Sequence, residues 1–228
     1  MNDDSLTLHD AGSLATLSRD AMLALLRERL RPLDQVAVPD DWRDGSVRTD
    51  TPRARLPWHP ETSKFAAVLV PLVDRPQGWQ VLLTERATHL KNHAGQISFP
   101  GGRIEPNDDG PIAAALRETL EEIGLPATHV QPLGRLPDHL IVSGYRVTPI
   151  VARVTPGFAL QLDSTEVART FEVPLNFLLD ERNHTPRTRR FEDRDYDFID
   201  MPYGEYNIWG ATAGMLMTLY RVLRGEDR

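Results

Sequence analysis

Three glutamates near the middle of the chain have a spacing that could bind a metal ion. Glu118, Glu121 and Glu122 follow Arg117 in the segment Arg-Glu-Thr-Leu-Glu-Glu. On a helix these positions share one face, so the three carboxylates would repel one another. Glu121 and Glu122 also lie near the end of the predicted helix, where the helix dipole disfavours negative charge. Carboxylates grouped at such a cost are typical ligands of Mg²⁺ or Mn²⁺, although the spacing alone also fits a solvated acidic helix face.

The residues before this segment favour a metal site over a merely acidic surface. Phe99-Pro-Gly-Gly102 breaks regular structure, and paired glycines permit a close backbone approach. The carbonyl of Gly102 could point at a cation, and Arg117 could hold one carboxylate in a fixed rotamer. Glycines, an arginine and clustered acids are together the groups that metal-assisted attack on a diphosphate requires.

The element that must position the glutamates is a helix predicted over residues 111–123. Pro111 suits its first turn, Gly124 suits a C-terminal cap, and Pro126 prevents continuation. The apolar residues expected to face the core are Leu116, Leu120 and Ile123.

Other apolar runs predict the surrounding sheet. Residues 65–73 and 79–84 form a predicted β-hairpin with a turn between them. Further strands are expected at 130–136, 145–154 and 170–174, and a closing helix at 209–223. The charged segment 187–197 is expected to be a solvated loop or an exposed hairpin. This mixture of strands and helices predicts an α/β or α+β fold.

Residues 1–62 are predicted to be an N-terminal extension, and residues 63–228 the main domain. Ser18 could cap a helix over residues 19–31, after which a Pro-, Asp- and Arg-rich connector follows. The apolar stripe of this helix consists of Met22, Leu25, Leu26 and Leu30. We expect the helix to pack on the main domain, and partner binding is the alternative.

The composition excludes several classes of protein. The chain has 228 residues, a net charge of −7 and no cysteine. The lack of cysteine excludes disulfides, thiolate zinc sites and thiol nucleophiles, and the negative charge disfavours nucleic-acid or membrane binding. The first residues do not resemble a secretory signal, so we expect a cytoplasmic protein. An acidic protein that binds an acidic small molecule needs a cation or a basic patch.

The segment from Gly102 to Leu125 resembles the Nudix box. Gly102-Arg-Ile-Glu-Pro-Asn-Asp108 is followed by Arg117-Glu118-Thr-Leu-Glu121-Glu122-Ile-Gly124-Leu125. The family pattern is a glycine, an acidic residue six positions later, and Arg-Glu-x-x-Glu-Glu-x-Gly before an apolar residue. Here Asp108 or Asp109 replaces the early glutamate, and Asp108 leaves one extra residue before Arg117.

A narrower resemblance is to the coenzyme A pyrophosphatase branch of this family. It is carried by Leu-Leu-Thr-Glu-Arg-Ala at 82–87, by Lys91 and Gly95, and by Phe-Pro-Gly-Gly at 99–102. Residues 143–149 and 209–213 are also similar to that branch. The branch usually has arginine at the position of Lys91, so the charge is kept but the bidentate geometry is lost.

The resemblance implies an α/β/α sandwich with a mixed central sheet and Mg²⁺ or Mn²⁺ as cofactor. The implied metal ligands are Glu118, Glu121, Glu122 and the Gly102 carbonyl. The implied catalytic residues are Glu121, Glu166 and Arg117, and the general base is left open between the two glutamates. The candidate phosphate contacts are Arg86, Lys91, Arg103 and Arg146. For Glu166 an exposed loop position, and for each cation a surface charge, is the alternative interpretation.

The implied reaction is hydrolysis of coenzyme A, or of acyl-CoA, to 3′,5′-ADP and 4′-phosphopantetheine. One alternative is hydrolysis of another nucleotide diphosphate such as ADP-ribose or NADH. A second is a non-catalytic Nudix ligand sensor, and a third is a structural domain with an acidic helix face. The intact Arg-Glu-Glu-Glu core argues against the sensor. A homodimer is left open.

Overall fold

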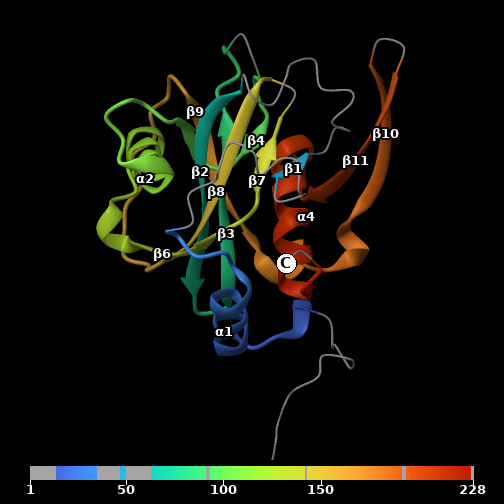
Figure 1. Cartoon of the computed structure of the whole chain (residues 1–228), viewed down its shortest axis with the longest axis horizontal. Coiled ribbons are helices and arrows are strands. Elements are labelled where there is room, and N and C mark those ends of the chain that lie inside the picture. The colour runs from blue at the N-terminus through green and yellow to red at the C-terminus, as the bar shows by residue number, and fades with distance from the viewer. Residues whose placement is uncertain are drawn as a thin grey trace, which may run out of the picture.

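The computed structural model describes residues 14–34, 47–49, 63–90, 93–141, 143–191 and 194–226. In these ranges a nine-stranded mixed sheet forms the centre, with α2 (Gly110–Ile123) on one face and α4 (Gly210–Arg224) on the other (Figure 1). This arrangement confirms the α/β fold class and the mixed central sheet. No helix of the described ranges is long and apolar enough to cross a membrane.

The predicted hairpin forms the middle of the sheet. Strands β2 (Lys64–Arg75) and β3 (Gly78–Arg86) are antiparallel, and Arg75 lies opposite Gly78 across a tight turn. Strand β8 (Tyr145–Val154) runs parallel to β2 along its length. The remaining strands of this sheet are β1 (Val47–Thr49), β4 (Ile97–Ser98), β5 (Gly101–Arg103), β6 (Val130–Arg135), β7 (Asp138–Leu140) and β9 (Val167–Pro174).

Strand β2 changes its neighbour halfway along its free edge. Residues 66–68 pair with β5, whereas residues 72–75 pair with β3. Strand β3 pairs with β9 along its other edge from Gln80 onwards, and at its end, beyond the residues that pair with β2, Thr84 and Glu85 pair with β4. The segment β4–β5 therefore fills a fork between the two strands, and the fork places the glycine pair beside α2.

Alternate residues of β2 supply two separate cores. Ala67 and Leu69 pack with Ile123 of α2, and Val70 and Leu72 pack on the side of α4 and of α1 (Arg19–Arg29). Met215, Leu216, Leu219 and Leu223 of α4 are buried, as their spacing predicts.

The structure corrects one detail of the carboxylate helix. The predicted span is confirmed to within one residue, but Leu120 is 51% exposed rather than in the core. The helix instead contacts the sheet through Ala114, Ala115, Thr119 and Ile123. Small side chains at this face let α2 lie close to β2 and β5.

The charged segment near residue 190 is the exposed hairpin of the two alternatives. Strands β10 (Thr185–Phe191) and β11 (Arg194–Tyr203) pair antiparallel and extend away from the sandwich, and β12 (Tyr206–Ile208) pairs with the inner end of β11 (Figure 1). Short turns of helix complete the fold: η1 (Leu14–Thr16), η5 (Ala127–His129), α3 (Leu175–Leu178) and η6 (Glu181–Asn183). Strands β1, β4, β5, β7 and β12 were not predicted from the sequence. The expectation that residues 99–102 break regular structure is wrong for Gly101 and Gly102, which pair with β2 as part of β5.

The N-terminal helix packs on the sheet as its apolar stripe predicts. The Ser18 hydroxyl accepts the N–H of Ala21, and Met22, Leu26 and Leu30 are buried. The helix ends before the predicted Arg31, because Arg31 forms a two-way backbone bridge with Arg135. The predicted connector falls mostly on residues 35–46 and 50–62, which lie outside the described residues. The division at residue 62 stays a prediction.

Candidate active site

Two glycines bring strand β5 against the carboxylate helix. A Cβ at Gly101 would lie 2.4 Å from the carbonyl oxygen of Ala67, and a Cβ at Gly102 would lie 2.6 Å from the Cδ of Glu118. At Gly101 the close atoms belong to the backbone of β2, so no side chain fits there, and at Gly102 a side chain would fit only if the Glu118 carboxylate moved. The glycine pair therefore allows the Glu118 carboxylate to rest directly on the strand backbone.

Glu122 is the most deeply placed acid of the cluster. It is 5% exposed, and its Oε2 accepts the N–H of Gly101 at 3.1 Å. The pKa of Glu122 is raised to about 7, mainly by burial and also by the negative charge of Glu166. The hydrogen bond from Gly101 and the positive charge of Arg86 act in the opposite direction. The side chains of Glu166 and Arg86 are therefore close enough to act electrostatically on this carboxylate.

Glu118 shares the same electrostatic environment. Burial is the main cause that raises the pKa of Glu118, and the Arg117 guanidinium opposes it. The carboxylates of Glu121 and Glu166 raise this pKa further. Glu166 precedes β9 and is exposed, yet its charge acts on both the half-buried Glu118 and the buried Glu122, so the loop acid lies at the same site.

Arg117 organises the acids around it. Its Nη1 donates to Glu118 Oε1 at 3.0 Å and to Glu121 Oε2 at 2.9 Å, and its Nη2 donates to the Arg103 carbonyl at 3.1 Å. It also binds both oxygens of Asp108, each at 2.9 Å. The Arg117 bonds are the main cause that lowers the pKa of Asp108 to about 2.

The contacts of Asp108 and Asp109 indicate which of them corresponds to the early acidic residue of the Nudix-box pattern. Asp108 is bound by Arg117 and accepts the N–H of Glu105 at 2.7 Å. Asp109 is the N-cap residue of α2 but makes no side-chain capping bond. Asp108 occupies the place of the early acid in the pattern, and the extra residue is absorbed at the start of the helix.

The four candidate phosphate contacts have different positions. Arg86 ends β3 and acts on Glu122, and Arg103 ends β5 with an exposed side chain. Arg146 is only 2% exposed, and its Nε donates to the buried carboxylate of Asp138 at 2.7 Å. Lys91 lies outside the described residues.

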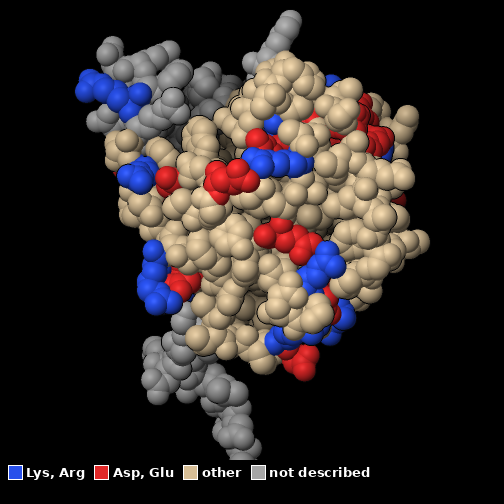
Figure 2. Space-filling view, turned by 180° about the vertical axis from the view of Figure 1, so that it is seen from behind, with Lys and Arg blue, Asp and Glu red and all other residues tan. Residues whose placement is uncertain are grey.

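The carboxylate and carbonyl oxygens of the cluster are suitable ligands for a hard divalent cation, but their side chains are not yet arranged as a complete coordination site. In the described part of the chain, no three Asp, Glu, His or Cys side chains are arranged to hold a metal ion. One reason is that Glu121, with a side chain 58% exposed, is turned to Arg117. Burial is the main cause that raises the pKa of Glu118 and of Glu122, and a cation beside them would favour the charged form of both carboxylates. Seen from behind, acidic side chains gather towards the upper right, on the side of α2 (Figure 2).

A groove of about 270 Å³ lies elsewhere, between η1, the start of α1 and the β2–β3 turn. That turn is at the opposite end of β2 from the strand β5. The groove therefore does not overlap the carboxylate cluster.

Comparison with known proteins agrees with this geometry. The family model described as "NUDIX domain" matches residues 63–195. The chain belongs to the Nudix family. Curated Nudix hydrolases named NudL and described as uncharacterized are similar: one from Shigella flexneri is 40% identical over 168 residues, covering 73% of this chain and 86% of its own. One from Escherichia coli K12 is 42% identical over 155 residues, covering 68% and 80%.

Solved structures share less with this chain. A C. elegans Ap4A hydrolase has a TM-score of 0.41 and 23% identity, covering 48% of this chain and 80% of its own. DR0079 from Deinococcus radiodurans has a TM-score of 0.45 and 12% identity, covering 69% and 83%.

Sequence reasoning missed two contacts at the candidate site of this Nudix protein. The pairing of Asp108 with Arg117 was not predicted, although the six-residue spacing from Gly102 was the available signal. Asp163 was not among the predicted site residues, yet its N–H donates to the Glu122 carbonyl at 2.9 Å. No sequence pattern connects these last two positions, because the contact depends on how the loop folds against α2.

Proposed function

We propose that this Nudix hydrolase cleaves the diphosphate bond of a nucleotide derivative with the help of Mg²⁺ or Mn²⁺, and that its substrate is coenzyme A or acyl-CoA. The observation that carries the proposal is the placement of the Glu118 and Glu122 carboxylates beside the Gly101–Gly102 backbone. The choice of coenzyme A is supported by the resemblance of residues 82–102 to the coenzyme A pyrophosphatase branch. Arg86 and the glycine pair, which belong to this stretch, lie at the carboxylate cluster.

The roles of the acids follow from their surroundings. Glu118, Glu122 and the Gly102 carbonyl would hold the cation, which supplies charge neutralisation of the diphosphate and activation of the attacking water. Glu121 is turned to Arg117, so it would join the ligands only after a change of rotamer. Glu166 has no such partner among the described side chains and acts on both buried acids, so we assign to it the role of general base.

The cations have two different roles in the proposal. Arg117 is a positioning residue, since it fixes the orientation of Glu118 and of Asp108. Arg86 and Arg103, together with Lys91, would bind substrate phosphates. Arg146 is buried against Asp138, so a structural ion pair describes it better than a substrate contact.

A substrate panel tests the proposal. Coenzyme A, acetyl-CoA, NADH and ADP-ribose are each incubated with the protein and Mg²⁺ or Mn²⁺, with and without EDTA, and the products are separated by chromatography. We expect 3′,5′-ADP from coenzyme A and no product with EDTA. Faster turnover of ADP-ribose or NADH would replace the substrate assignment, and no turnover of any diphosphate would favour the ligand sensor.

The Glu122→Gln variant tests the metal assignment separately. The amide keeps the shape of the side chain but cannot supply a charged ligand, so we expect turnover to fall by about a hundredfold or more. A Glu226→Gln variant, altered just beyond the C-terminal end of α4, serves as a control for the loss of one negative charge. Undiminished turnover in Glu122→Gln would contradict the role of Glu122.

A further inference from the structure

The loop between β8 and β9 is bound to the end of the carboxylate helix. The N–H of Gln161 donates to the carbonyl of Ile123, and the N–H of Asp163 donates to the carbonyl of Glu122, each at 2.9 Å. Gly124 permits this approach: its φ is +68°, and a Cβ there would lie 2.8 Å from the Gln161 nitrogen. These bonds satisfy carbonyls that the last helical turn would otherwise leave unpaired.

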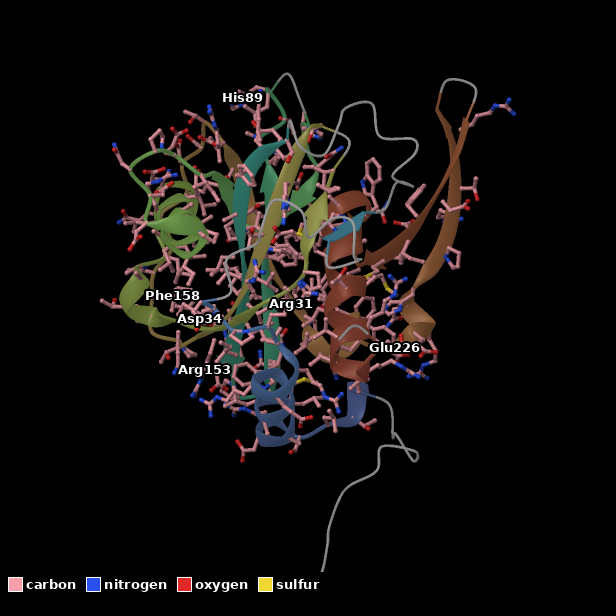
Figure 3. All side chains as sticks on the ribbon, in the orientation of Figure 1. Arg31, Asp34, His89, Arg153, Phe158 and Glu226 are labelled. Carbon is pink, nitrogen blue, oxygen red and sulfur yellow. The ribbon has the colours of Figure 1, made fainter. Side chains whose placement is uncertain are left out.

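The loop starts far from the site and returns to it along α2. In Figure 3, Phe158 of this loop and Arg153 of β8 lie in the lower half of the molecule, and His89, which follows β3, lies at the top. The segment that follows Phe158 therefore runs along the helix before it delivers Glu166 to the start of β9. The position of Glu166 depends on how this last segment is held.

Asp163 closes the turn that carries Glu166. Its Oδ1 accepts the N–H of Thr165 at 2.9 Å and the hydroxyl of Thr165 at 2.7 Å. Its own carbonyl accepts the N–H of Glu166 at 3.0 Å and that of Val167 at 2.8 Å. The Thr165 bonds also lower the pKa of the Asp163 carboxyl, so this acceptor stays ionised.

The other side of Glu166 is fixed as well. Its carbonyl accepts the N–H of Ala87 at 2.8 Å, and Ala87 follows Arg86 directly. Backbone bonds therefore connect Glu122 to Asp163, Asp163 to Glu166, and Glu166 to the strand end that bears Arg86. Because Glu166 itself is exposed, the place from which its side chain extends is set mainly by this backbone frame.

We propose that Asp163 is a positioning residue that holds Glu166 in place towards Glu118 and Glu122. The inference rests on the proposed function, in which Glu166 is the general base. Asp163 touches neither substrate nor cation in this account. It acts by fixing the turn, and catalysis is sensitive to displacement of a catalytic group by as little as 1 Å.

Kinetics of Asp163 variants test the inference. Asp163→Ala should lower kcat about tenfold to a hundredfold, because a small misplacement of a catalytic group has effects of this size. KM should change less than about twofold, since substrate contacts remain. Asp163→Asn should retain most of the activity, because its amide oxygen can still accept both bonds from Thr165. Thr165→Val removes only the 2.7 Å bond and should give an intermediate loss.

The matched control is Asp180→Ala. Asp180 accepts the N–H of Arg182 at 3.0 Å in the same i to i+2 arrangement, but it lies at η6, away from α2. Its removal should leave kcat unchanged. Equal losses in the two alanine variants would overturn the proposal, because a general effect on loop order would then explain both.

A double-mutant cycle separates positioning from general damage. In a Glu166→Gln background, Asp163→Ala should cause little further loss, because the group that it positions is already inactive. A full additional loss in that background would overturn the inference, and so would wild-type kcat in Asp163→Ala while Glu166→Gln is impaired. If Asp163→Ala does not fold, the same cycle with Thr165→Val decides the matter.

Failure of the underlying function would look different. It would appear as absent turnover in the wild-type protein, or as full activity in Glu166→Gln. In the second case the general base and the inference about Asp163 fall together, and the metal assignment remains to be judged on Glu122→Gln alone.

Discussion

Arg117 binds both carboxylate oxygens of Asp108, from Nε and from Nη2, at 2.9 Å in each case. Asp108 belongs to the segment that leads from β5 into α2, and Arg117 lies in the middle of that helix. The pair therefore binds the segment between β5 and α2 to the middle of the helix. The same guanidinium also binds Glu118 and Glu121, so one cation fixes three acids.

This pair should make stability depend on pH in the acid range. The pKa of Asp108 is lowered to about 2, below the value of about 3.9 expected in the unfolded chain. An acid with a lowered folded pKa stabilises the protein above the unfolded pKa, and this contribution is lost as the pH falls through both values. Asp108→Asn should therefore be less stable than the wild type at pH 6, and the difference should shrink towards pH 2. Urea unfolding at several pH values measures it, and a constant difference would contradict the pairing.

Glu122 should have the opposite dependence on pH. Its pKa is raised to about 7 from an unfolded value of about 4.3, so the folded protein is favoured by protonation. That stabilisation is complete below the unfolded pKa and is lost as the pH rises through about 7. In EDTA, Glu122→Gln should be more stable than the wild type at pH 8, by on the order of 3 kcal/mol, and about equal to it at pH 4. Thermal or urea unfolding tests this, and Mg²⁺ or Mn²⁺ should stabilise only the wild type at pH 8.

Gly102→Ala should damage the site more than the fold. The added Cβ would displace the Glu118 carboxylate, so we expect kcat to fall by about tenfold or more. A useful comparison is Gly134→Ala, where the new Cβ would lie 2.5 Å from the Leu30 Cβ under the N-terminal helix. That variant should lower the melting temperature and leave kcat near normal below it. Wild-type kcat in Gly102→Ala would show that Glu118 need not rest on the strand.

Arg86 and Arg146 should respond differently to substitution by alanine. Arg86→Ala should raise KM several-fold with little change in stability, because Arg86 acts on Glu122 and forms no ion pair with a carboxylate among the described residues. Arg146→Ala should instead cost about 3 kcal/mol of stability, because it leaves the Asp138 carboxylate buried and less compensated. Urea unfolding and steady-state kinetics on both variants distinguish the two roles. A KM effect without destabilisation in Arg146→Ala would return it to the substrate contacts.

Local patterns predicted the elements well where one periodicity dominates. The run from Tyr145 to Val154 and the helix from Pro111 to Ile123 were both found from their apolar spacing and their glycine and proline limits. Leu120 was misplaced because a helical wheel weighs large apolar residues, whereas this contact is made by alanines and a threonine that allow a close approach.

The positions of the charged residues were harder to predict. Arg146 was predicted to be a phosphate contact because the sequence does not show that Asp138 is its partner. The two residues meet only through the pairing of β7 with β8. The role of Asp163 depends in the same way on a contact with Glu122 from a distant part of the chain. Sequence spacing describes neighbours along one element, and these contacts join different elements.

The change of neighbour along β2 has a consequence for how substrate preference can evolve. The first half of β2 pairs with the glycine-containing strand β5, and its second half pairs with the hairpin partner β3. Each half of β2 is therefore held by a different strand. The stretch between β3 and β4 is not part of these β2 pairings. Under the proposed function, substitutions at residues 87–90 and 93–96, which lead from β3 to β4, can change substrate preference while the glycine pair keeps its place against β2.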